Sequence, residues 1–180
     1  MQLTDREFWA VIHGLVLGTL FLLAFGGGIA GFWSLRDRFL TDEGVKERTP
    51  RLILGSWVMA IVAWATVITG TWIVYPWYRA TPPAGTTDLT KFPKALLTTG
   101  PDKATTADWH HFGMEWKEHV AWLAPMLATT VAFIVLYYGI QLYRHGEIRR
   151  ALLIMFTLAF AAAGVAGLFG AFITKAAPIA

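Results

Sequence analysis

Long apolar runs separated by short polar stretches dominate the chain. Four stretches free of Asp, Glu, Lys and Arg cover about residues 8–35, 52–78, 120–143 and 151–174, each at least 24 residues long. About 20 helical residues suffice to cross the hydrocarbon core of a bilayer. The pattern predicts an all-α integral membrane protein whose four transmembrane helices form a single transmembrane domain over residues 1–180.

The connections between these stretches differ in length and in charge. Residues 36–51 and 144–150 are short and hold eight of the fifteen basic residues, whereas the long connection, residues 79–119, is rich in Pro and Gly. Positive charge in short loops favours the cytoplasmic side. We therefore expect both short loops inside, and the long loop and both termini outside.

Short loops favour antiparallel neighbours, so the four spans are expected to form two helical hairpins in a four-helix bundle. Glycines are spaced for close helix packing, as in HGLVLG, which contains Gly14 and Gly18, and in GGGIAG. Small residues at such spacing let backbones approach each other in lipid. Pro125 is expected to kink the third span.

Composition narrows the class further. The 180 residues are 56% hydrophobic and 15% charged, with no Cys and a net charge of +3. Without cysteine there are no disulfides, thiolate metal sites or covalently attached haem. A small, scattered positive charge gives no basis for nucleic-acid binding.

The stretch WHHFGMEWKEHVAW, residues 109–122, holds three of the five histidines together with two carboxylates. Its imidazoles and carboxylates are His110, His111, Glu115, Glu118 and His119. In an α-helix, His111, Glu115, Glu118 and Trp122 fall on one face. Thr105 and Thr106 are expected to cap this helix at its N-terminus, and a short helix is expected at residues 89–97.

His13 interrupts the first apolar run. An ionisable group inside a membrane is costly and marks a candidate functional site; a structural hydrogen bond to a neighbouring helix is the alternative. The predicted topology places His13 and His119 at similar depth near the outer face. One histidine from each hairpin can ligate a haem iron from two sides, and Gly14 and Gly18 leave space for a flat macrocycle.

A second interpretation uses the polar stretch alone. His111, Glu115 and His119 are spaced i, i+4, i+8, and His110 or Glu118 can add a ligand. Imidazole and carboxylate ligands suit Zn or Fe. In a third interpretation, Glu115, Lys117 and Glu118 face water or a partner protein.

Aromatic residues crowd the predicted outer interface. Trp116, Trp122 and Tyr75 are expected to pack around the site, and Tyr75 is placed to line a haem or a quinone. Thr66, Thr69 and Thr71 are expected to bond back to carbonyls of their own helix.

The span pattern, with His13 and His119, resembles the four-helix membrane b-type cytochromes that serve as quinone-reactive or electron-transfer subunits of larger complexes. The resemblance implies haem b, and a quinone as an electron partner. Members with two haems have a histidine pair near each face, whereas the inner halves of these spans contain no histidine. The resemblance therefore implies a single haem, near the outer face.

We therefore expect a redox subunit that passes electrons, with no catalytic residues of its own. Membrane lipid and other membrane or periplasmic redox subunits are the expected partners, in the inner (cytoplasmic) membrane of a bacterium or archaeon. The alternatives are a cofactor-free structural or assembly subunit and a His/Glu metal site at the outer interface, including a metal-dependent enzyme.

Overall fold

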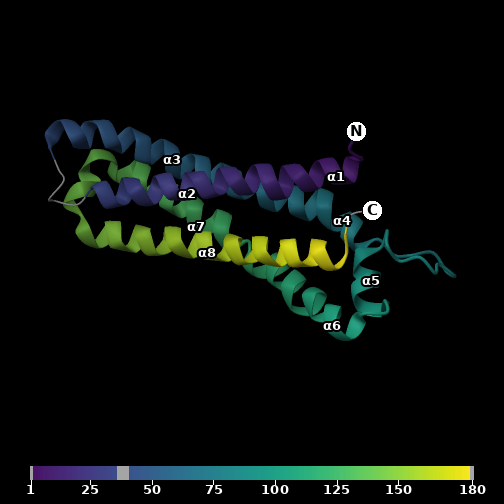
Figure 1. The fold of residues 1–180 in the computed structure, drawn as a ribbon. Coiled ribbons are helices and arrows are strands. Elements are labelled where there is room, and N and C mark those ends of the chain that lie inside the picture. Colours follow the sequence, from purple (N-terminus) through teal and green to yellow (C-terminus); the bar gives the residue numbers. More distant parts are fainter. Residues whose placement is uncertain (1, 36–40, 179–180) are drawn as a thin grey trace. The chain divides into compact units, whose positions relative to one another are not determined.

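A computed structural model describes residues 2–35 and 41–178 of the chain, and within these ranges it contains helices and connections but no strand (Figure 1). Arg36 and Arg38, which belong to the first predicted cytoplasmic loop, lie outside the described residues. The prediction of an all-α protein is confirmed for the described part of the chain.

Four of the helices are long and apolar enough to cross a membrane, which makes this a multi-pass membrane protein. They run over Asp5–Ser34, Asp42–Arg79, Lys103–Arg144 and Gly146–Ala176, and measure 30, 38, 42 and 31 residues. The last three each contain one predicted span and extend beyond it at both ends, and the first covers all of its predicted span except residue 35. The largest difference is in the third helix, which begins at Lys103, within the stretch that the sequence assigns to the long loop.

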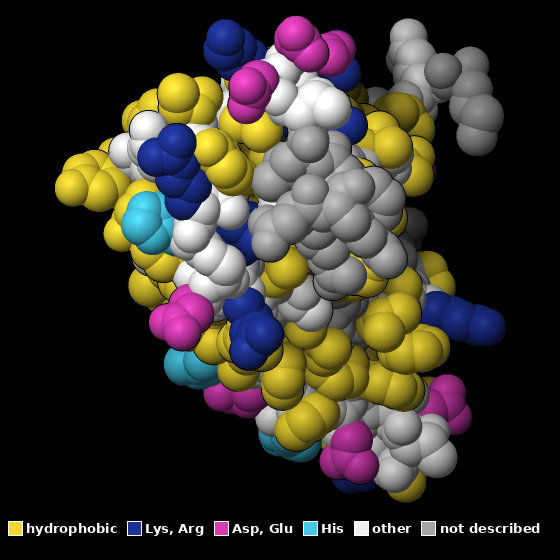
Figure 2. Space-filling model, turned by 90° about the vertical axis from the view of Figure 1, so that its left-hand side faces the viewer, with side chains coloured by type: hydrophobic (Ala, Val, Ile, Leu, Met, Phe, Trp, Pro, Cys, Tyr) yellow, Lys and Arg dark blue, Asp and Glu magenta, His cyan; other side chains and the backbone are white. Residues whose placement is uncertain are grey.

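Large apolar side chains are exposed along these helices, as a membrane surface requires. Leu23, Leu54 and Tyr137 are 67%, 66% and 84% exposed. Hydrophobic side chains make up much of the surface seen in Figure 2. In water such a surface would be an aggregation hazard, whereas in lipid it is the expected exterior.

The chain divides into two compact units. The first comprises Met1–Gly18, Thr66–Trp122 and Gly164–Ala180, and the second comprises Thr19–Ala65 and Leu123–Ala163. Each unit is built from segments of all four long helices.

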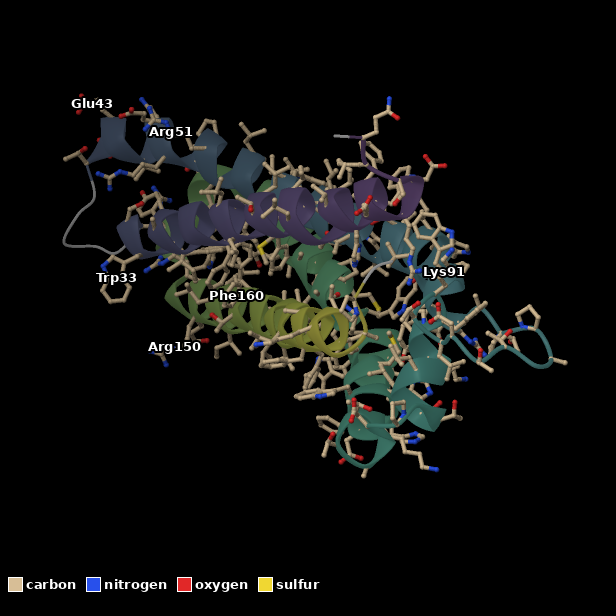
Figure 3. The ribbon with its side chains drawn as sticks, turned by 45° about the vertical axis from the view of Figure 1, so that its right-hand side comes forward. Trp33, Glu43, Arg51, Lys91, Arg150 and Phe160 are labelled. Atoms are coloured by element: carbon tan, nitrogen blue, oxygen red, sulfur yellow. The ribbon has the colours of Figure 1, made fainter. Side chains whose placement is uncertain are left out.

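In the second unit, α2 (Leu17–Ser34) packs on α8 (Gly146–Ala176) through stacked phenylalanines. The rings of Phe25 and Phe160 are 3.9 Å apart between centroids, and Phe160 lies between the two helices (Figure 3). The ring of Phe156 lies against Gly28, where even a methyl group would collide with it. Gly28 is thus a site of close helix approach, and so is Gly31, where an added Cβ would lie 2.9 Å from Leu52; Gly27, which the glycine spacing pairs with Gly31, has no atom within 4 Å of an added Cβ.

A second contact in this unit joins α3 (Asp42–Thr69) to α7 (Leu123–Tyr138). Trp64 Nε1 donates a hydrogen bond of 3.0 Å to Thr129 Oγ1, and that hydroxyl donates one of 2.6 Å to the carbonyl oxygen of Pro125. The two helices are therefore joined by a polar contact within an apolar setting. The third long helix is interrupted at residues 121–122, where Pro125 has no N–H for the carbonyl of Ala121.

The core of the first unit is formed by Tyr78, Leu97, Met114, Ile173 and Ala177, all at most 6% exposed. These residues come from α4 (Tyr75–Arg79), α5 (Pro93–Thr99), the third long helix and the end of α8. The unit also contains α1 (Asp5–Ala10) and α6 (Lys103–Asp108). The long connection therefore packs against the helix ends.

Two local predictions for the long connection need correction. The short helix expected at 89–97 is Pro93–Thr99, because Pro93 is favoured in the first helical turn and Asp88 accepts hydrogen bonds from the N–H and hydroxyl of Thr90. These bonds lower the pKa of Asp88. Neither Thr105 nor Thr106 caps the histidine-bearing helix, because both hydroxyls donate to the carbonyl of Asp102.

Candidate functional site

Four segments of the first unit are wound as π-helix, a rare conformation that is frequent at functional sites. They are η1 (Val11–Val16), η3 (Gly70–Val74), η4 (Trp109–Met114) and η5 (Trp116–Val120). Together they carry His13, His110, His111, Glu118 and His119. All the predicted site residues that can bind a metal, apart from Glu115, therefore lie in π-helical backbone.

His13 is half-buried and is hydrogen-bonded to Thr69 of the second long helix. Its Nδ1 lies 3.1 Å from Thr69 Oγ1, and that hydroxyl donates its hydrogen to the carbonyl oxygen of Thr66. A hydroxyl has one hydrogen to donate, so Thr69 Oγ1 accepts from the N–H at His13 Nδ1. In the neutral ring, Nε2 then keeps its lone pair. A partner on the other ring nitrogen fixes the tautomer of metal-binding histidines in the same way.

Glycines make room around His13. A Cβ added at Gly70 would lie 2.8 Å from Cε1 and 3.3 Å from Nε2 of the ring, so the imidazole occupies the space that a side chain would take. Gly14 and Gly18, on the helix of His13 itself, have no atom within 4 Å of an added Cβ. That face of the helix is open, as the predicted packing of a flat cofactor requires.

His119 is oriented by its own helix. Its Nδ1 lies 3.0 Å from the carbonyl oxygen of Glu115 and 3.4 Å from the carboxylate of the same residue. Both partners only accept, so Nδ1 carries the proton and Nε2 of the neutral ring has a free lone pair. The side chain of His119 is 70% exposed. His13 and His119 therefore share one tautomer, but their rings are not in contact with each other.

His110 and His111 lie together on η4, with ring centroids 5.2 Å apart. Nδ1 of His110 is 2.9 Å from the hydroxyl of Tyr78, which is 6% exposed. This hydrogen bond ties the third long helix to α4. His111 is exposed.

The predicted polar face is not formed as the sequence suggests. The prediction assumes α-helical spacing throughout, whereas η4 and η5 have i→i+5 hydrogen bonding, which alters the residues that share a face. Glu115 turns to His119, and Glu118 is a neighbour of Tyr75. Within residues 2–35 and 41–178, no three His, Asp or Glu side chains gather as a metal ion would require.

Tyr75 links several polar groups at the end of the second long helix. Its neighbours include Glu118 and Arg79, and the Arg79 guanidinium lies 5.2 Å from the centre of its ring. The rings of Tyr75 and Tyr78 are stacked with centroids 6.1 Å apart. Tyr75 thus connects the acidic side chain on η5 to the Tyr78–His110 pair.

The predicted aromatic packing involves specific partners. Trp122 meets Trp72 edge to face with centroids 6.3 Å apart, and Trp116 lies 6.2 Å from Phe169 of α8. A Cβ added at Gly113 would lie 3.4 Å from the side chain of Phe169, in ordinary van der Waals contact. These contacts hold η4 and η5 against α8.

Lys117, which the third interpretation has facing water or a partner protein, is half-buried. Its ammonium donates a hydrogen bond of 3.2 Å to the carbonyl oxygen of Ala166. Nζ lies 3.0 Å from where a Cβ of Gly170 would be. In the sequence, only the glycines of α8 pointed to this contact, because a helix without side chains at those positions lets a long side chain reach its backbone.

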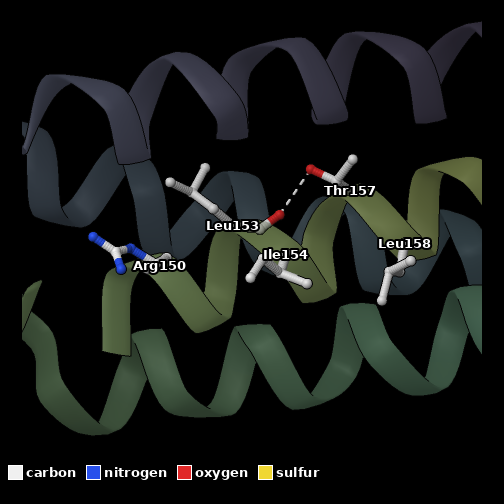
Figure 4. A pocket seen from close by; sticks show the side chains of 5 residues that line it. All are labelled: Arg150, Leu153, Ile154, Thr157 and Leu158. Atoms are coloured by element: carbon white, nitrogen blue, oxygen red, sulfur yellow. Dashed lines mark hydrogen bonds between the residues drawn. The ribbon is translucent and has the colours of Figure 1, made fainter. Parts of the chain in front are cut away.

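A shallow groove of about 280 Å³ lies elsewhere, on α8 in the second unit (Figure 4). It is lined by Arg150, Leu153, Ile154, Thr157 and Leu158. The Thr157 hydroxyl donates to the carbonyl of Leu153, so it offers no free donor hydrogen to a ligand. The groove contains none of the predicted site residues.

Comparison with known proteins gives no match: no family model fits the chain, and neither a curated protein nor a solved structure is similar to it.

Proposed function

We propose that the chain is a membrane redox subunit that binds one haem b through His13, with His119 as the second ligand, and transfers electrons within a larger complex. The observation that carries this proposal is the setting of His13. The imidazole lies in π-helical backbone inside an apolar span, Thr69 fixes its Nδ1–H, and Nε2 has no hydrogen-bond partner among the described residues.

The residues present fit the chemistry of a haem ligand pair. Two neutral imidazoles with protonated Nδ1 offer Nε2 lone pairs, and filling both axial positions suits electron transfer rather than ligand binding. A bound haem supplies a one-electron redox couple. Under this proposal, other chains of the complex, or lipid, would cover the cofactor at the open face of Gly14 and Gly18 and at the exposed His119.

Around this pair, the chain offers groups that move protons or contact a partner. The Tyr78–His110 hydrogen bond and the neighbouring side chains of Tyr75 and Glu118 place polar groups at the ends of the spans. We assign proton handling to Glu118, Glu115 and His111, and we keep a quinone as the proposed electron partner beside Tyr75. Under the predicted topology, this site is at the outer face of the inner membrane.

Histidine substitution tests the assignment. The purified protein is expected to show a b-type Soret band and a pyridine haemochrome, which His13→Ala and His119→Ala each abolish or strongly reduce. His145→Ala is the matched control, because His145 lies in the short connection between α7 and α8 with its ring against Tyr138. Equal haem content in all three variants would contradict the ligand assignment.

A cofactor-free structural or assembly subunit is the second candidate. Gly26 and Gly27 have no atom within 4 Å of an added Cβ, and Leu22 and Leu23 beside them are 56% and 67% exposed, so α2 carries a small-residue face open to another chain. A stable larger complex that co-purifies without haem, and that histidine substitutions leave intact, would favour this function.

A further inference from the structure

The shallow groove on α8 in the second unit is apolar along most of its length and positively charged at one end. Arg150 lies at that end and Leu158 at the other, with Leu153, Ile154 and Thr157 between them (Figure 4). Their spacing in the sequence places all five on one face of the helix. Ile154 and Leu158 are 55% and 54% exposed, so this face is open at the surface of the second unit.

The groove runs from the level of the lipid headgroups into the hydrocarbon. The stretch of α8 that is free of Asp, Glu, Lys and Arg begins at Ala151, directly after Arg150. Arg150 therefore marks the boundary between the polar connection and the apolar span. From Arg150 to Leu158 the helix rises about 12 Å, and one half of the hydrocarbon core is about 15 Å thick. The groove thus has the direction and the length of an acyl chain in one leaflet.

The guanidinium of Arg150 is free to bind an anion. Within the part of the chain that the structure describes, it forms no hydrogen bond or ion pair, although Glu147 lies one helical turn before it. Arg149, by contrast, donates to two backbone carbonyls of η6 (Gly139–Arg144). A guanidinium carries five N–H donors in a planar fork that matches a phosphate group. Arg150 can therefore bind a phosphate without losing a contact to the described residues.

We infer that this groove is a binding site for an anionic phospholipid, whose phosphate pairs with Arg150 while one acyl chain lies along Leu153, Ile154 and Leu158. Under the predicted topology this end of α8 is cytoplasmic, and the cytoplasmic leaflet is the one with a negative surface. A zwitterionic lipid also has a phosphate, but the cation of its headgroup opposes the attraction to Arg150. The inference is independent of the proposed haem, because the groove contains none of the proposed ligands.

Two lipids with the same acyl chains test the inference, dioleoyl phosphatidylglycerol and dioleoyl phosphatidylcholine. The full chain in detergent is titrated with each, and native mass spectrometry of the lipid-bound protein gives the two affinities. The wild type should bind the anionic lipid about fivefold more tightly, as one basic side chain at a membrane surface provides. Arg150→Gln should lose this preference, and Arg150→Lys should keep most of it.

Arg51→Gln is the matched control. Arg51 is an exposed arginine at the same end of the second unit, on α3, and its charge is paired with Glu47 at 2.7 Å (Figure 3). This variant should keep the preference for phosphatidylglycerol. If it loses as much as Arg150→Gln, the positive charge of the whole surface attracts the lipid, and the inference is wrong. It is also wrong if the wild type binds both lipids equally or if Arg150→Gln discriminates as well as the wild type.

Thr157→Phe tests the apolar part of the site. Thr157 is exposed, so a larger side chain there fills the groove without entering the core of the second unit. The variant should bind both lipids more weakly than the wild type and should have an unchanged unfolding temperature. Binding equal to that of the wild type would show that no acyl chain lies in the groove.

Discussion

The ammonium of Lys117 and the backbone carbonyl of Ala166 are joined by a hydrogen bond of 3.2 Å between the third and fourth long helices. The contact is possible because Gly170, one turn further along α8, has no side chain in the path of the lysine. A charged residue at the start of an apolar run thus becomes part of the helix packing, and the site residues on η5 are positioned with it.

Alanine substitution at two glycines of α8 tests this arrangement. Gly167→Ala should raise the free energy of unfolding by about 0.5–1 kcal/mol, because the helix gains propensity and an added methyl meets no atom within 4 Å. Gly170→Ala should show no such stabilisation, because the added methyl group displaces the Lys117 ammonium from the carbonyl of Ala166. Unfolding in mixed micelles measures both, and equal gains would contradict the close approach of Lys117.

The glycine contact in the second unit predicts a larger effect. Gly28→Ala brings a methyl group into the ring of Phe156, which must shift along with the phenylalanine stack, whereas Gly27→Ala enters open space. Overpacking of this kind costs about 1–3 kcal/mol. The same unfolding measurement should show destabilisation for Gly28→Ala alone. If the two variants are equally stable, α2 and α8 do not pack at Gly28.

The hydrogen bond that Thr69 accepts from His13 should strengthen the binding of haem iron by this histidine. Thr69→Val removes the acceptor of the N–H at His13 Nδ1, and loss of such a partner weakens metal binding about 10–100-fold. Thr157→Val is the control, because that hydroxyl bonds only to the Leu153 carbonyl of its own helix. Haem titration of both variants measures the effect, and unchanged affinity in Thr69→Val would show that the contact does not orient an iron ligand.

The absence of cysteine allows a clean test of the predicted orientation. In intact cells, a membrane-impermeant maleimide should label Thr87→Cys, in the long connection, and should not label Glu147→Cys, in the first turn of α8. Both positions are exposed in the structure. After the membrane is permeabilised, both should react. The reverse pattern in intact cells would place the termini inside.

The sequence was sufficient to predict the four long apolar helices, since each depends only on a local run of apolar residues that is long enough to span a bilayer. It was also sufficient to pick out His13, because a polar residue within such a run is conspicuous. The third span was predicted to start at Val120, within a helix that begins at Lys103, because the span was defined by the absence of charged residues, and Lys117 and Glu118 end that stretch.

Other features of the site depend on contacts between distant segments. The role of Lys117 requires the backbone of Ala166, and that of Thr69 requires His13, 56 positions away. The π-helical windings at η4 and η5 changed the face on which His111, Glu115 and Glu118 lie, and the spacing of residues alone does not reveal such a change.

The most direct test of the account is the haem content of the purified full chain, measured as pyridine haemochrome against protein concentration, together with the spin state of the oxidised iron. The account predicts one b-type haem per chain with a low-spin, six-coordinate iron, as two histidine ligands impose. A folded protein that is colourless and gives no haemochrome, even when purified from cells supplied with haem, would contradict it.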